Sequence, residues 1–123
     1  IPHDSVFRPA VKYKSYDGFC PIGPWIMTKS DVSNPDDLTV KVYINGKLKQ
    51  ENTTRNLVRT VSKLIADVTE FMTLDEGDML LVGAPENPPL AKHGDLVRIE
   101  IDHIGFLENR VLAEESMVRG LRR

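Results

Sequence analysis

Two lysines, Lys12 and Lys14, stand at the start of a loop that is rich in Gly and Pro. In an extended chain the side chains alternate between faces, so both ammonium groups lie on one side of the backbone. The loop continues through Asp17-Gly18 and Pro21-Ile-Gly-Pro24, residues that favour turns. A stiff loop with two cations suits the capture of a carboxylate or a phosphate. The alternative for each lysine is an ordinary solvated position.

The histidines and the cysteine give weaker signals. His3, His93 and His103 are far apart in the sequence, and none stands beside a second ligand at the spacing of a metal site. We expect each of them at the surface or in a turn. Cys20 has no neighbouring cue for an activating base, which favours a buried structural thiol.

Acidic residues cluster at Asp75, Glu76 and Asp78, before a short apolar run. They have the chemistry to attract a cation, but a turn explains them better, because Gly77 supplies the backbone freedom that a turn needs. The sequence contains no nucleophile elbow, Walker loop or dinucleotide fingerprint.

Alternating apolar residues predict a β-hairpin. From Leu38 to Ile44 every second residue is apolar, the pattern of a half-buried strand. Asn45-Gly46 then suits a type I′ turn, and Lys47 to Glu51 returns as a charged edge strand.

Further elements follow along the chain. Thr60 is a candidate cap for a helix from Val61 to Met72, whose apolar stripe predicts packing on a sheet. Met79 to Val82 reads as a short buried strand. Leu96 to Asp102 alternates cleanly as another strand, and Ile104 to Leu112 turns and pairs back. These elements predict a mainly β (α+β) fold with one packed helix.

Composition excludes several classes of function. The chain has 123 residues, 41% hydrophobic and 28% charged, as is typical of a globular domain. A net charge of −2 gives no reason to expect nucleic acid or an anionic membrane as partner. No apolar run approaches the roughly 18 residues of a membrane span, and no signal peptide is visible. The single Cys20 excludes an intramolecular disulfide and fits a reducing compartment, so we expect a cytoplasmic protein.

The lysine loop also carries a family resemblance. From Arg8 to Pro24 it reads Arg-Pro-Ala-Val-Lys-Tyr-Lys-Ser-Tyr-Asp-Gly-Phe-Cys-Pro-Ile-Gly-Pro, which resembles the signature loop of the fumarylacetoacetate hydrolase family. The resemblance is greatest to members that isomerise and decarboxylate intermediates of 4-hydroxyphenylacetate (homoprotocatechuate) degradation. It continues, in the family's order, through Asn45-Gly46, Phe71 to Asp78, Gly83-Ala-Pro85, Gly94-Asp95 and Ile104 to Asn109.

The resemblance implies a domain organisation. Residues 1–112 are similar to the carboxy-terminal portion of the family's β-roll, a partial catalytic domain, and residues 113–123 are left as a tail or linker. The chain begins without Met, in what reads as the middle of an element, so we expect a preceding segment. We also expect a homo-oligomer or pairing with a second family domain, because a piece of this roll exposes sheet edges.

The resemblance further implies a site. Family members hold Mg²⁺ or Mn²⁺ with an acidic triad, whose Asn-Asp and Glu-x-Glu motifs would lie upstream of Ile1, so we expect no metal ligand in this chain. Lys14 matches the family lysine beside metal and substrate, and is the predicted catalytic and substrate-binding residue. Gly83, Ala84 and Pro85 are predicted to border the substrate. The family usually has Thr at the position of Ala84, so a hydroxyl is missing here.

The function implied by the resemblance is metal-dependent decarboxylation or isomerisation of a small 2-oxo dicarboxylic acid from aromatic catabolism. The ion would polarise the 2-oxo carbonyl and stabilise an enolate. One alternative is hydrolysis of an acylpyruvate or fumarylacetoacetate-type C–C bond. Another is a catalytically silent half-domain, which Ala84 supports. The chain on its own is expected to be inactive.

Overall fold

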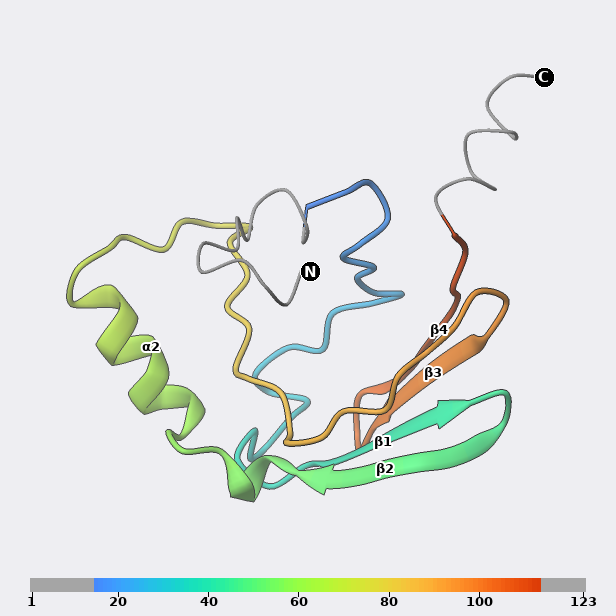
Figure 1. The fold of residues 1–123 in the computed structure, drawn as a ribbon. Helices are drawn as coiled ribbons and strands as arrows, with labels where there is room; N and C mark the ends of the chain where they lie inside the picture. The colour runs from blue at the N-terminus through green and yellow to red at the C-terminus, as the bar shows by residue number, and fades with distance from the viewer. Residues whose placement is uncertain (1–14, 114–123) are drawn as a thin grey trace.

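The computed structural model describes residues 15–113, and its centre is a four-stranded antiparallel sheet (Figure 1). The strands are arranged in the order β2-β1-β3-β4, so the two central strands come from distant parts of the sequence. The predicted fold class, mainly β with one helix, is confirmed. The strands are β1 (Thr39–Ile44), β2 (Lys47–Thr53), β3 (Leu96–Ile101) and β4 (Gly105–Arg110).

The first hairpin forms as the sequence predicts. Asn45 and Gly46 both have positive φ, 51° and 78°, which is the conformation that a type I′ turn requires. The pairing of β1 with β2 contains an irregularity, because Val42 lies opposite Gln50 whereas Tyr43 lies opposite Leu48. Lys49 is therefore the extra residue of a β-bulge.

The second hairpin, β3 with β4, is also confirmed and is joined to the first through side chains. The Asn45 Nδ2 group donates to Asp95 Oδ1 at 2.8 Å, and the backbone N–H of Leu96 donates to Asn45 Oδ1 at 2.9 Å. The turn after β1 is thus held against the beginning of β3. Trp25 fastens the opposite end of β3 and β4, because its Nε1 group donates to the Ile104 carbonyl oxygen at 2.6 Å.

The helix α2 (Val61–Thr69) begins where predicted and ends earlier than Met72. The Thr60 side chain accepts a hydrogen bond from the Lys63 backbone N–H at 3.3 Å, which confirms the predicted cap. A short 3₁₀ helix, η1 (Thr54–Asn56), precedes it. In Figure 1 α2 stands apart from the sheet, and none of its residues is buried, so the predicted packing of its apolar stripe on the sheet is not found within residues 15–113.

The buried core of the described residues is small. Its buried hydrophobic residues are Leu38, directly before β1, and Ile44, the last residue of β1. Other apolar side chains stay open to solvent, for example Val58 at 95% and Leu90 at 87% exposed. With so few buried side chains, much of the apolar surface of the described residues is not covered.

Two local predictions are wrong for the same reason. Met79 to Val82 forms no strand, and Leu81 is 79% exposed. Cys20, expected to be buried, is exposed. An apolar residue is buried only if a partner surface exists, and residues 15–113 do not supply one at these positions.

Candidate functional site

A small groove of about 150 Å³ lies where β1 and β2 meet the segment that follows Leu81. Gly83, Ala84 and Pro85, which the sequence predicts beside the substrate, all line it. The structure therefore brings these three residues together with the central part of the sheet. The remaining lining consists of Val40, Asn52, Thr53, Thr54, Asn56, Leu57 and Val82.

The polar side of the groove is organised by side-chain amides. Asn52 Oδ1 accepts hydrogen bonds from the Thr53 backbone N–H at 2.8 Å and from Asn56 Nδ2 at 2.7 Å. Within residues 15–113 the Asn52 Nδ2 group donates no hydrogen bond. It is thus a donor that a ligand oxygen in the groove can use. Thr54 has a structural role, since its Oγ1 accepts from the Leu38 backbone N–H at 2.8 Å.

The apolar side of the groove comes from Val40, Leu57 and Val82. A second hollow shares Gly83 and Ala84 in its lining and includes Leu64 of α2. The Gly83-Ala84 segment therefore lines both hollows, one at the sheet and one that reaches α2. Gly83 has φ of 127°, a conformation that side chains rarely adopt, so a glycine suits the bend.

No lysine or arginine is part of the groove's lining in the described residues. Arg55 lies close in sequence, but it forms a two-pronged pair with Asp37, with Nη2 to Oδ2 at 2.8 Å. The hydrogen bond from Arg55 lowers the pKa of Asp37, and the same bond raises the pKa of Arg55. The positive charge of Arg55 is thus already paired with the carboxylate of Asp37. Lys14, the cation that the sequence proposes, lies outside the described residues.

The other residues singled out in the sequence have local structural roles. The Asp75 backbone N–H donates to Asp78 Oδ2 at 2.8 Å, as a turn requires, so the turn role of this acidic cluster is confirmed. His93 and His103 are exposed, as predicted, and His93 Nδ1 accepts from the Ala113 backbone N–H at 2.8 Å. His3 lies outside the described residues.

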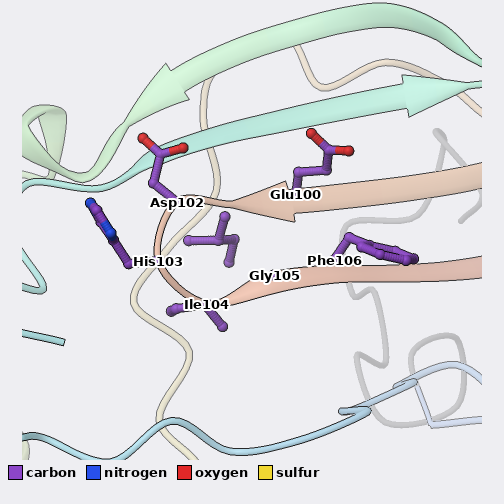
Figure 2. A pocket seen from close by; sticks show the side chains of 7 residues that line it. Glu100, Asp102, His103, Ile104, Gly105 and Phe106 are labelled. Carbon is purple, nitrogen blue, oxygen red and sulfur yellow. The ribbon is translucent and has the colours of Figure 1, made fainter. Parts of the chain in front are cut away.

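A wider hollow of about 440 Å³ lies at the turn between β3 and β4 (Figure 2). Figure 2 shows Glu100, Asp102 and His103 along the end of β3 and its turn, with Phe106 on the returning strand. Glu100 is engaged by Arg98 at 2.6 Å, and the Arg98 guanidinium lies 3.8 Å from the centre of the Phe106 ring. These groups therefore stabilise the hairpin.

The described residues do not provide a metal site. Among residues 15–113, no three His, Cys, Asp or Glu side chains gather in an arrangement that could hold a metal ion. A divalent ion at the groove would therefore need ligands from outside this range. The same range contains no helix that is both long and apolar enough to cross a bilayer.

Comparison with known sequences identifies relatives. The model of the fumarylacetoacetate (FAA) hydrolase C-terminal family matches residues 2–112. A 4-hydroxyphenylacetate degradation bifunctional isomerase/decarboxylase of Salmonella dublin is 43% identical over 113 residues, which are 92% of this chain and 26% of that protein. A mitochondrial oxaloacetate tautomerase of Xenopus laevis is 40% identical over 106 residues, 80% of this chain and 33% of that protein. The chain thus spans about a quarter to a third of these relatives.

Solved structures share the fold. Maleylpyruvate hydrolase from Sphingobium sp. SYK-6, in complex with manganese(II) and pyruvate, superposes with a TM-score of 0.79 at 40% identity. The match covers 85% of this chain and 40% of that one. A fumarylacetoacetate hydrolase from Exiguobacterium antarcticum gives a TM-score of 0.76 at 35% identity, over 84% of this chain and 39% of that one.

Proposed function

Because this chain belongs to the fumarylacetoacetate hydrolase family, as its motifs predict, we propose that it forms part of an enzyme that isomerises or decarboxylates a 2-oxo dicarboxylic acid from aromatic catabolism. The observation that supports this most is the similarity to bifunctional isomerase/decarboxylases, which extends over 92% of the chain at 38 to 43% identity. It includes the segment from Gly83 to Pro85 that borders the groove.

The groove residues would bind and orient the substrate. Val40, Leu57 and Val82 offer apolar contact to a short carbon chain, and Asn52 Nδ2 offers a hydrogen bond to a carboxylate or carbonyl oxygen. Lys14 would supply the cation that the described lining lacks, and would pair with a substrate carboxylate. Apolar side chains beside that pair would strengthen its attraction, because they would lower the local dielectric constant.

We assign the cofactor, Mg²⁺ or Mn²⁺, to residues outside the described range, because residues 15–113 offer no suitable cluster of ligands. The maleylpyruvate hydrolase that resembles this chain was solved with manganese and pyruvate, which supports a divalent ion and a 2-oxo acid. The partner of this chain would be a second copy or a second family domain.

Two alternatives rest on particular observations. The 40% identity to maleylpyruvate hydrolase favours hydrolysis of a C–C bond. This reaction needs an activated water in addition to the groove. Ala84, which carries no hydroxyl at the rim, favours a silent half-domain that pairs with an active copy.

The full-length protein, supplied with Mn²⁺, would be tested for tautomerisation of oxaloacetate, ultraviolet loss of 5-carboxymethyl-2-hydroxymuconate and release of acid from maleylpyruvate. We expect turnover in one of the first two assays. Turnover of maleylpyruvate alone would favour the hydrolase. No turnover in any assay would contradict our proposal and favour the silent half-domain.

Lys14→Ala tests the predicted cation. Loss of a charged group that contacts the reacting part of a substrate costs about 100-fold or more in kcat/KM. Lys29→Ala is the control, because it removes an exposed lysine to which no role in the site is assigned, and we expect it to change kcat/KM by less than about 3-fold. Equal effects of the two substitutions would remove Lys14 from the site.

A further inference from the structure

Gln50 joins β2 to the rim of the groove. Its Nε2 group donates to the Glu86 carbonyl oxygen at 3.0 Å and to the Asn87 carbonyl oxygen at 3.4 Å. Both acceptors come directly after Pro85, so Gln50 holds the backbone at the point where the lining of the groove ends. The partners are far apart in sequence, and the bonds therefore fasten one distant segment to the sheet.

The register of β2 explains why Gln50 points to the rim. Val40 pairs with Asn52 and Val42 pairs with Gln50, so this part of the ladder is regular. Residues two apart on a strand share a face, which puts Gln50 and Asn52 on the same side of β2. Asn52 and its partner Val40 line the groove. The β-bulge at Lys49 comes directly before Gln50 and determines which face of β2 carries Gln50 and Asn52.

The segment from residue 79 to 91 has few other anchors. It forms no strand or helix, and Leu81 and Leu90 are exposed. In the described part of the chain, the two bonds from Gln50 are the hydrogen bonds that this segment makes. Figure 1 shows it running from α2 past the sheet to β3 without regular structure. Few hydrogen bonds and few buried contacts are the properties of a segment that opens easily.

We propose that Gln50 is a positioning residue. It fixes the segment from Gly83 to Asn87, the groove wall, against β2, and thereby sets the affinity of the groove for 2-oxo acids. The proposal rests on the function proposed above. Gln50 acts through the backbone and not by contact with the substrate. Its effect should therefore be on KM, while kcat stays nearly constant.

The test compares variants of Gln50 in the full-length protein. Gln50→Met keeps the length of the side chain and removes the N–H donor. Gln50→Glu keeps the shape of the side chain, but its carboxylate can only accept hydrogen bonds and cannot donate to the backbone carbonyl oxygens of the wall. Gln50→Lys restores a donor on a long side chain and should rescue the loss. Lys47→Met, at the exposed start of β2, is the control for a change on the same strand.

Two measurements are needed. We expect Gln50→Met and Gln50→Glu to raise KM for oxaloacetate by about 3- to 10-fold, the value of one hydrogen bond, with kcat within about 2-fold. We also expect faster cleavage by chymotrypsin after Leu81 or Leu90, with the thermal midpoint nearly unchanged. Gln50→Lys and Lys47→Met should resemble the wild type in both.

The outcomes separate this inference from the proposed function. If the wild type turns over no 2-oxo acid, the proposed function fails, and the Kd for pyruvate measured by calorimetry with Mn²⁺ replaces KM. The Gln50 inference is overturned if Gln50→Met leaves cleavage at the wall unchanged. It is also overturned if the wall is cleaved faster while KM, or the Kd for pyruvate, stays at the wild-type value.

Discussion

Ala84 is the residue at which this groove departs most clearly from its family resemblance. Its methyl group lies in the lining between Gly83 and Pro85, and it is exposed. We expect Ala84→Thr in the full-length protein to lower KM for oxaloacetate by about 3- to 10-fold, because the added hydroxyl can donate to a substrate carboxylate.

Ala84→Val is the matched control, since valine has nearly the shape of threonine without the hydroxyl. We expect it to leave KM unchanged or to raise it. An equal fall in KM for both variants would mean that the added volume, and not the hydroxyl, is responsible. The measurement is steady-state kinetics of the two variants beside the wild type.

The sequence could predict only part of this site. Gly83 to Pro85 were found through a family resemblance, and the structure places them in one groove. Asn52 and Gln50 were missed, because Asn52 shares the groove with a segment distant in sequence, and Gln50 bonds to the backbone of Glu86, 36 positions away. The pattern along β2 indicates an exposed edge strand and does not reveal which distant loop comes to lie against it.

At the level of elements, the hairpins are well predicted because their signals are local. Alternation sets the faces of β1 and β3, and Asn45-Gly46 fixes the register of the first turn. The run from Met79 to Val82 has an equally clear apolar signal, yet it forms no strand and pairs with none in residues 15–113. An apolar run predicts that its side chains are buried in the complete protein, but it does not predict which part of the protein packs against them.

The contact of Trp25 with Gly105 leads to a prediction about the β3–β4 hairpin. Gly105 has φ of 124°, and a Cβ atom there would overlap Trp25 Cζ2. We expect Gly105→Ala to destabilise the full-length protein by about 2 kcal/mol or more, through strain in the backbone and displacement of the indole. Thermal unfolding measures the loss.

A double mutant separates the two causes. In a Trp25→Ala background the overlap is absent, so Gly105→Ala should cost less, and the remaining cost reports the positive φ. Equal costs in both backgrounds would show that the indole does not lie on Gly105. The loss of the hydrogen bond from Trp25 to the Ile104 carbonyl is common to both members of that background and cancels.

Asp95, which joins the two hairpins through its hydrogen bond with Asn45, should make the thermal stability of the protein depend on pH. Hydrogen bonds from the Lys92 backbone N–H, and next from the Asn45 side chain, lower the pKa of Asp95 from its ordinary 3.8. A carboxyl whose pKa is lower in the folded state stabilises the fold above its unfolded pKa, and this contribution is lost as the pH falls through the folded pKa.

We therefore expect Asp95→Ala to lower Tm at pH 7, and the gap from the wild type to narrow as the pH is lowered below about 4. Asp102→Ala is the control, because the Asp102 side chain makes no hydrogen bond or ion pair within residues 15–113. Thermal scans from pH 3 to pH 7 provide the measurement. A gap that stays constant over this range would show that the Asp95 carboxylate is not responsible.

At the scale of the whole molecule, the chain exposes more surface than a self-contained domain does. Its accessible surface is 10581 Å², whereas a monomeric protein of 13.9 kDa has about 6,700 Å². Apolar side chains from separate segments contribute, including Ile26 at 89% and Phe71 at 78% exposed. Since the chain spans 26% of the isomerase/decarboxylase of Salmonella dublin, the rest of such a protein has ample surface to cover them.

This surface gives the last prediction. We expect the 123-residue chain, produced alone, to bind the apolar dye ANS strongly, to elute above its monomer mass of 13.9 kDa and to lose structure gradually in urea. Two buried core residues in the described range provide too little apolar burial to offset the entropy of ordering this chain. The full-length protein is the control and should unfold cooperatively with little dye binding. A monomeric isolated chain with a sharp urea transition and no dye binding would contradict the inference that its exposed apolar surface requires a partner.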